Sequence, residues 1–227
     1  MRRNILKDSA DFRIIRHPRR RKIALRIAPD GAVELLSPPD VPETFLRQIF
    51  QQQRDKIDSL LAGSRENLPR LPEFTEGESF FLLGKSHALH LSKRLRLFDG
   101  ERFIIPEGTA EKKKADLISL YREIASVQLL RRAEKMEEFT RLRASGWRIS
   151  STERRWGSCN AKGDIALSWK LIQCPPELID YVIIHELAHL QELNHSAAFW
   201  QIVAGYVPDF RRKRSELNRF ARGLPQL

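Results

Sequence analysis

Residues 175–195 constrain this chain more than any other segment, because they place three of its six histidines in and just after an apolar helix. Two prolines at residues 175–176 can begin this helix, and apolar side chains cover most of its surface. His185 and His189 lie four residues apart, so on a helix they point within about 40° of each other and can bind one metal ion. Glu186 projects to the same side, where it can accept a proton from water without being a ligand.

A third histidine, His195, completes a candidate ligand set if the helix ends between His189 and His195. On a continuous helix His195 would be rotated about 120° away from His189. Asn194 tolerates the left-handed conformation typical of such a helix end, so we expect the break there. Three neutral imidazoles leave one tetrahedral position open for water, which distinguishes a catalytic zinc site from a structural one. Two alternatives remain: a chance match to the His-Glu-x-x-His pattern, and a third ligand from Glu216.

Four short motifs accompany the helix, namely RWGSC at residues 155–159, YVIIHELAH at 181–189, NHS at 194–196 and FW at 199–200. Together they resemble the motifs of the YgjP-like zinc metallopeptidases and, more distantly, of the SprT-like proteases. The resemblance implies zinc ligands at His185, His189 and His195 and a general base at Glu186. The spacing of the last two histidines also occurs in metzincins. That clan is rejected, because Glu192 replaces its glycine and no methionine follows the motif.

Composition bounds the compartment and the partners. Of the 227 residues, 41% are hydrophobic and only two are cysteines, so the chain can bury one or two cores without disulfides, as in a reducing cytosol. No signal-like or membrane-spanning apolar run occurs, and we expect a cytoplasmic protein without a membrane partner. The net charge of +11 predicts an anionic partner. Basic clusters at residues 16–22 and 211–214 are candidate contacts for nucleic acid or nucleotides, or are simply solvated surface.

Hydrophobic periodicity predicts an α+β fold in two parts. Residues 1–110 read as an N-terminal, mainly antiparallel β region with a covering helix. Residues 111–227 read as a helical zincin-like metallopeptidase domain with a small β-hairpin or sheet. We expect strands at residues 12–17, 22–28, 32–36, 79–92, 94–98, 102–106 and 147–172, a turn at 29–31, and helices at 43–63, 113–142, from 176, 196–206 and 209–224.

The strands within residues 147–172 have two interpretations. A strand beside the histidine helix can pair with an extended substrate if its edge is open. Alternatively it is an internal strand with Trp156 and Trp169 in the core. Arg154 and Arg155 either orient an anionic substrate group or form structural ion pairs, and Arg155 and Tyr206 are the candidates to stabilise an oxyanion.

The sequence therefore predicts a zinc-dependent hydrolase, most simply a metallopeptidase that acts on peptides or proteins with a zinc-activated water and Glu186 as general base. Hydrolysis of a nucleotide phosphoanhydride is one alternative, although magnesium-dependent phosphate chemistry usually needs several carboxylates. A basic nucleic-acid-binding module with structural zinc is another. Against the structural-zinc alternative, the sequence has no fourth histidine or cysteine near the motif to close the metal site.

Overall fold

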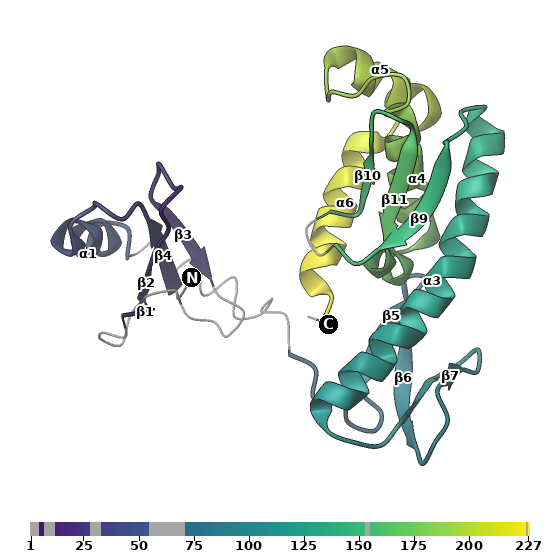
Figure 1. Ribbon diagram of the computed structural model, residues 1–227, viewed down its shortest axis with the longest axis horizontal. Helices are drawn as coiled ribbons and strands as arrows, with labels where there is room; N and C mark the ends of the chain where they lie inside the picture. Colours follow the sequence, from purple (N-terminus) through teal and green to yellow (C-terminus); the bar gives the residue numbers. More distant parts are fainter. Residues whose placement is uncertain (1–4, 7–11, 28–32, 55–70, 153–154, 226) are drawn as a thin grey trace. The chain divides into compact units, whose positions relative to one another are not determined.

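The computed structural model describes residues 5–6, 12–27, 33–54, 71–152, 155–225 and 227. The chain divides into two compact units, Met1–Leu71 and Pro72–Leu227, each with its own hydrophobic core (Figure 1). Among the described helices, none combines the length and the apolar character that a membrane crossing requires.

In its described residues the first unit is a small sheet with a helix packed on it, as the hydrophobic pattern predicts. Its elements are β1 (Ile5–Leu6), β2 (Arg13–Arg16), β3 (Ala24–Ile27), β4 (Val33–Ser37) and α1 (Glu43–Gln52). The strand order is β1-β2-β4-β3, with β2 and β4 parallel and the other pairs antiparallel. Leu46 and Phe50 of α1 join Leu35 of the sheet in one buried cluster. The expected turn at residues 29–31 and the expected helical residues 55–63 lie outside the described residues.

The second unit begins with another four-stranded sheet, which packs on a long helix. Its elements are β5 (Ser79–Leu82), β6 (Lys85–Ser92), β7 (Leu97–Phe98), β8 (Phe103–Pro106) and α3 (Ala110–Thr140). Phe80 and Phe103 of the sheet are buried in the same cluster as Leu117 and Tyr121 of α3. Because these strands share a core with the helices that follow, the division of the chain falls at residues 71–72, whereas the sequence suggests 110–111.

A second, three-stranded sheet and three helices complete this unit. The elements are β9 (Gly146–Ser150), β10 (Gly157–Cys159), β11 (Asp164–Ser168), the 3-10 turn η1 (Trp169–Gln173), α4 (Pro176–Ala188), α5 (Ala197–Tyr206) and α6 (Phe210–Gly223). The strand order is β10-β11-β9, with β10 antiparallel and β9 parallel to β11. In the described part of the chain β10 is therefore an edge strand, while the central strand β11 is largely buried.

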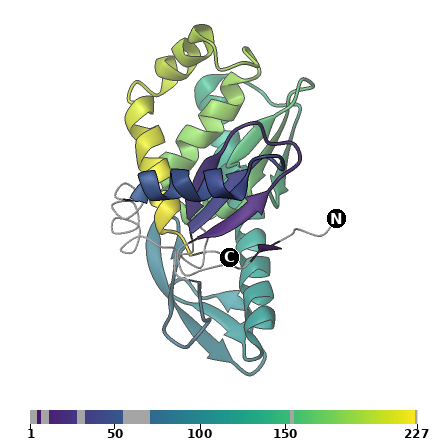
Figure 2. The ribbon, with the colours of Figure 1, turned by 90° about the vertical axis from the view of Figure 1, so that its left-hand side faces the viewer.

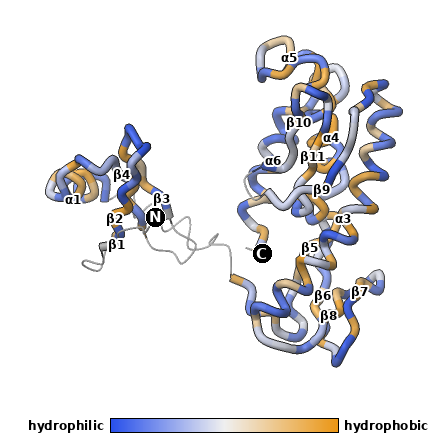
Figure 3. The backbone as a smooth tube through the Cα atoms, in the orientation of Figure 1, coloured by the Kyte–Doolittle hydropathy of each residue, from blue (hydrophilic) through white to orange (hydrophobic). Residues whose placement is uncertain are grey.

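Helix α4 occupies the centre of this region. It contacts α3, α5, α6 and β10, which is why apolar residues are needed on nearly all its sides. Figure 2 shows α4 between α6 and the β9–β11 sheet, and Figure 3 shows the apolar α4 beside the mostly hydrophilic α6. The long helix α3 packs beside α4, and an ion pair between Arg132 and Asp180 joins the two helices.

Glu137, near the end of α3, is a buried carboxylate that secures β9. Its oxygens accept hydrogen bonds from the N–H of Ala144 at 2.8 Å, from Nε1 of Trp147 at 2.9 Å and from Arg143 at 3.2 Å. Burial raises the pKa of Glu137, but these three donors outweigh it and lower the pKa below its ordinary value. The ionised form is therefore the one that stabilises the fold.

We expect Glu137→Gln to lower the free energy of unfolding at pH 7 by about 1–3 kcal/mol, because buried donors lose a charged acceptor. Since the folded pKa is depressed, this contribution is present above the unfolded pKa and is lost as the pH falls through the folded pKa. Denaturant titrations at pH 7 and in acid measure the difference. The exposed neighbour Glu138→Gln is the control, and equal stability of both variants at pH 7 would contradict the assignment.

Candidate metal centre

Helix α4 carries His185 in its last turn and ends at Ala188, so that His189 is its C-terminal cap. The N–H groups of the two residues after His189 donate to carbonyls three residues earlier, at 3.0 and 3.1 Å. These tightened turns satisfy the terminal carbonyls without a left-handed residue. The left-handed conformation predicted at Asn194 is wrong, because Asn194 is not among the described residues with positive φ. The predicted break itself is present, at the end of α4.

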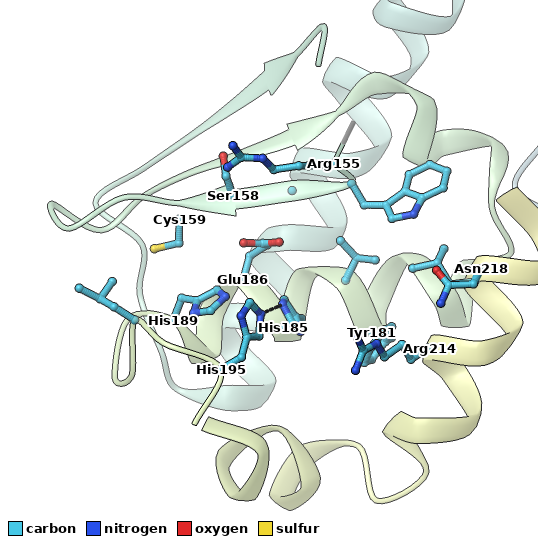
Figure 4. A pocket seen from close by; sticks show the side chains of 15 residues that line it. Arg155, Ser158, Cys159, Tyr181, His185, Glu186, His189, His195, Arg214 and Asn218 are labelled. Atoms are coloured by element: carbon cyan, nitrogen blue, oxygen red, sulfur yellow. Dashed lines mark hydrogen bonds between the residues drawn. The ribbon is translucent and has the colours of Figure 1, made fainter. Parts of the chain in front are cut away.

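The break brings the three predicted histidines together (Figure 4). Candidate ligand atoms of His185, His189 and His195 all lie within 4.8 Å of one another. The Nε2 atoms of His185 and His195 are 3.0 Å apart. The second ring nitrogen of His189, Nδ1, lies 3.0 Å from the carbonyl oxygen of Glu192, a contact in which Nδ1–H donates and Nε2 keeps its lone pair.

Aromatic residues of α5 hold the imidazoles in place. Ser196 caps α5, so the helix begins at Ala197, two residues after His195. The buried Phe199 ring lies 4.9, 4.4 and 4.8 Å, centroid to centroid, from His185, His189 and His195. Nδ1 of His185 is buried without a partner among the described residues, so packing against these rings orients His185.

The environment favours the neutral form of His185 and of His195. Burial, together with the charges of His189, His195 and Arg214, lowers the pKa of His185 to about 3. Burial, His189 and Arg214 likewise lower the pKa of His195. A neutral imidazole has the lone pair that a metal ion requires, so no proton has to be displaced at neutral pH.

Glu186 lies beside this cluster and is only 6% exposed. Burial raises the pKa of Glu186 to about 7, against an opposing effect of the Arg155 charge. The edge strand β10 covers the carboxyl at Gly157. A Cβ atom on Gly157 would lie 2.7 Å from Cγ and Oε1 of Glu186, so only glycine fits here.

The histidines and Glu186 line a pocket of about 340 Å³. Its walls are β10 with the preceding Arg155 and Trp156, the His185 side of α4, Leu193 and one face of α6 (Figure 4). The interpretation of β10 as an open edge is thus the one that the fold bears out. Trp169 is in the core, whereas Trp156 is half-buried at the pocket.

Two residues considered from the sequence lie elsewhere. Glu216, the alternative third ligand, accepts a hydrogen bond from Arg212 at 2.9 Å and is outside the histidine group. The Tyr206 hydroxyl donates to the carbonyl of Thr140 at 2.9 Å and does not line the pocket, which leaves Arg155 as the oxyanion candidate at the site. Arg154 lies outside the described residues. Tyr181, Arg214 and Asn218 line the pocket, although no spacing in the sequence connects α6 with α4.

The basic clusters are partly occupied by internal contacts. Arg16 donates to the carbonyls of Pro39 and Val41 at 2.7 and 2.8 Å. Arg212 pairs with Asp209 and Glu216. Binding of nucleic acid or nucleotides by these clusters stays a prediction.

Comparison with known proteins places the chain in a family. Comparison with curated proteins gives no match. Two solved structures are similar: the metallopeptidase zymogen abylysin of Pyrococcus abyssi (21% identity, TM-score 0.39, 43% of this chain and 99% of that one) and the metallopeptidase zymogen jannalysin of Methanocaldococcus jannaschii (17%, 0.33, 39% and 94%). The model of the YgjP-like metallopeptidase domain matches residues 21–220. With its histidine cluster inside that range, the chain belongs to the YgjP-like family of metallopeptidases.

Proposed function

We propose that this metallopeptidase is a zinc enzyme in which His185, His189 and His195 bind the metal and Glu186 is the general base. One observation carries the proposal: three imidazoles converge within 4.8 Å at the floor of a pocket, beside a buried carboxyl that belongs to no ion pair among the described residues. Such a carboxyl is costly to bury unless its chemistry is used.

The donor set fits a late transition metal. Two nitrogen ligands of a tetrahedral zinc ion are about 3.3 Å apart, close to the 3.0 Å between the Nε2 atoms of His185 and His195. The contact of His189 Nδ1 with the Glu192 carbonyl is the outer hydrogen bond that zinc-binding histidines usually have. Three neutral nitrogens favour zinc over magnesium or calcium, which prefer oxygen ligands.

The residues around the histidines supply the remaining chemistry. Zinc, when bound, would supply a Lewis acid that acidifies water and polarises the scissile carbonyl. Glu186 accepts the proton of the attacking water and returns it to the leaving amine. In the metal-free chain burial raises the pKa of this carboxyl to about 7, and the charge of a bound metal ion would lower it. Arg155 lines the pocket and carries the positive charge that would stabilise negative charge on the carbonyl oxygen.

We further propose that the substrate binds as an extended strand along β10. This strand has an open edge in the described part of the chain and forms one wall of the pocket, with Gly157, Ser158 and Cys159 facing it. Main-chain hydrogen bonds along such an edge hold a peptide irrespective of its side chains. A peptide held there passes over Glu186.

The two alternative functions are less well supported. The family is one of peptidases, so a peptide bond is favoured over a phosphoanhydride. A structural zinc would need a fourth protein ligand, and the metal-type cluster found among the described residues consists of three histidines.

We expect the purified chain to contain about one zinc ion, because a three-imidazole site retains such a metal. His185→Ala combined with His189→Ala should remove it, since one remaining imidazole binds weakly. The double variant His87→Ala and His90→Ala is the matched control, because these histidines contact Glu101 and Glu76 outside the cluster. Elemental analysis measures the metal. Full occupancy in the first double variant would refute the site.

A further inference from the structure

One end of the pocket is formed by residues that neither the ligand set nor the general base explains. Tyr181 lies on α4 one turn before His185, and Arg214 and Asn218 lie one turn apart on α6. All three line the pocket, and Figure 4 shows them gathered on the side away from His189. The pocket therefore extends beyond the reacting atoms to a second set of polar groups.

The Tyr181 hydroxyl is a hydrogen-bond donor that has no partner among the described residues. Tyr181 is only 4% exposed, yet its hydroxyl makes no hydrogen bond with any described residue. Burial raises the pKa of Tyr181 against the opposing charge of Arg214, so the hydroxyl keeps its proton at neutral pH. The hydroxyl is not among the fully buried atoms that lack a partner, so it is accessible at the pocket, where it can donate to a bound molecule.

Arg214 brings a positive charge to the same end of the pocket. Its guanidinium lies 5.4 Å from the centroid of the Trp200 ring and forms no ion pair with a described residue. Arg212, on the same helix, is paired with two carboxylates. The charged residues of the pocket wall, apart from the histidines, are Arg155, Arg214 and the single acid Glu186. This part of the pocket therefore attracts an anionic group.

We propose that Tyr181, Arg214 and Asn218 form a subsite for a carboxylate of the peptide substrate. A guanidinium donates through a planar fork that matches the two carboxylate oxygens, and the phenol and the amide add single donors. The carboxylate is either the C-terminus of a peptide or the side chain of an aspartate or glutamate. The inference rests on the proposed peptidase function, because the scissile bond must lie at the histidines while the carboxylate contacts α6.

Three probes test the subsite by calorimetry on the full-length Glu186→Gln chain, in which turnover is blocked. They are the peptide acetyl-Ala-Ala-Phe as free acid, its C-terminal amide, and acetyl-Ala-Asp-Phe as amide. At least one acidic probe should bind about tenfold or more tightly than the neutral amide, as charged hydrogen bonds predict. Tighter binding of the free acid would identify a C-terminal carboxylate as the ligand, and tighter binding of the aspartate peptide would identify a side-chain carboxylate. Each titration is repeated after chelation, because zinc itself attracts carboxylates.

Introducing Arg214→Gln or Tyr181→Phe into the Glu186→Gln chain should remove most of its preference for the acidic probe over the neutral amide. Arg219→Gln, which deletes the same charge from an α6 position that does not line the pocket, should retain it. Equal affinity for all three probes would overturn the subsite. So would a preference that survives Arg214→Gln, or one that falls equally in Arg219→Gln, since general attraction to a basic surface would then explain it.

Tyr181→Phe also separates carboxylate binding from an oxyanion role. The phenol donates no hydrogen bond to the part of the chain that the structure describes, so the thermal midpoint should stay within about 2 °C of the unaltered protein. With an active enzyme, a carboxylate contact predicts a loss of kcat/KM for the acidic substrate alone, whereas oxyanion stabilisation predicts equal losses for acid and amide. Turnover retained in Glu186→Gln would contradict the proposed mechanism. The subsite would still be tested independently, by the affinity of metal-free protein for the acidic probes relative to the neutral amide.

Discussion

Glu186→Gln should lower kcat by about 100-fold or more while the metal content and the fold are preserved, because the substitution removes the group that we propose accepts the proton of the attacking water. The amide has nearly the shape of the carboxyl, so the contact with Gly157 and the histidine cluster stay in place. Steady-state kinetics on a cleaved peptide, with elemental analysis of the same sample, measure both quantities.

The same substitution should stabilise the metal-free protein in alkaline solution. The pKa of Glu186 rises from its ordinary 4.5 to about 7, so the folded chain holds a proton that the unfolded chain has lost. Stability therefore falls as the pH rises between these values, by about 3 kcal/mol in total. Glu186→Gln should remove this loss and unfold at higher denaturant than the unaltered chain at pH 8, but not below pH 4. A residue that costs stability where it stands is typical of a functional site.

Glu177→Gln is the matched control, because Glu177 is an exposed residue in the first turn of the same helix. It should change neither turnover nor the pH dependence of unfolding. Full turnover in Glu186→Gln would exclude Glu186 as the base and favour one of the alternative functions.

Gly157→Ala should inactivate the enzyme almost as strongly, although it changes no group that takes part in the chemistry. The added Cβ would lie 2.7 Å from Cγ and Oε1 of Glu186 and 2.8 Å from Cδ, closer than such atoms approach. Because Glu186 is buried between β10 and α4, its carboxyl must shift, and a displacement of about 1 Å costs about 100-fold in rate. We expect kcat to fall by this factor while the zinc is retained.

A double-variant comparison shows whether Gly157 acts through Glu186. In the Glu186→Gln background, Gly157→Ala should lower kcat little further, because the base is already lost. Gly146→Ala is the control in the same sheet, since its Cβ would meet only the end of the Asp164 side chain, at 3.3 Å. Equal further losses in both backgrounds would assign the effect of Gly157 to strand distortion.

The sequence by itself determined the central helix and the identity of its chemical groups. The spacing of His185, Glu186 and His189 has a fixed meaning on a helix, because positions four residues apart share a face whatever surrounds them. The prediction that His195 follows a helix end also depends on local geometry, and the cluster of three imidazoles confirms it. Apolar periodicity likewise predicts α3 and the strands of both units, since burial of one face is a property of each segment.

Only the tertiary structure decided what lies opposite these segments. Periodicity predicts strands with a buried face within residues 79–106. It does not predict which element covers that face, and the structure shows that these strands share a core with Tyr121 of α3. The same holds for Gly157, which is an ordinary strand glycine in the sequence and becomes the cover of Glu186 only because β10 crosses α4 there. Arg214 reaches the pocket, and Glu216 two residues later does not, because α6 packs on α4 with one face only. Contacts between residues this far apart follow from how whole elements pack, and no local pattern contains that information.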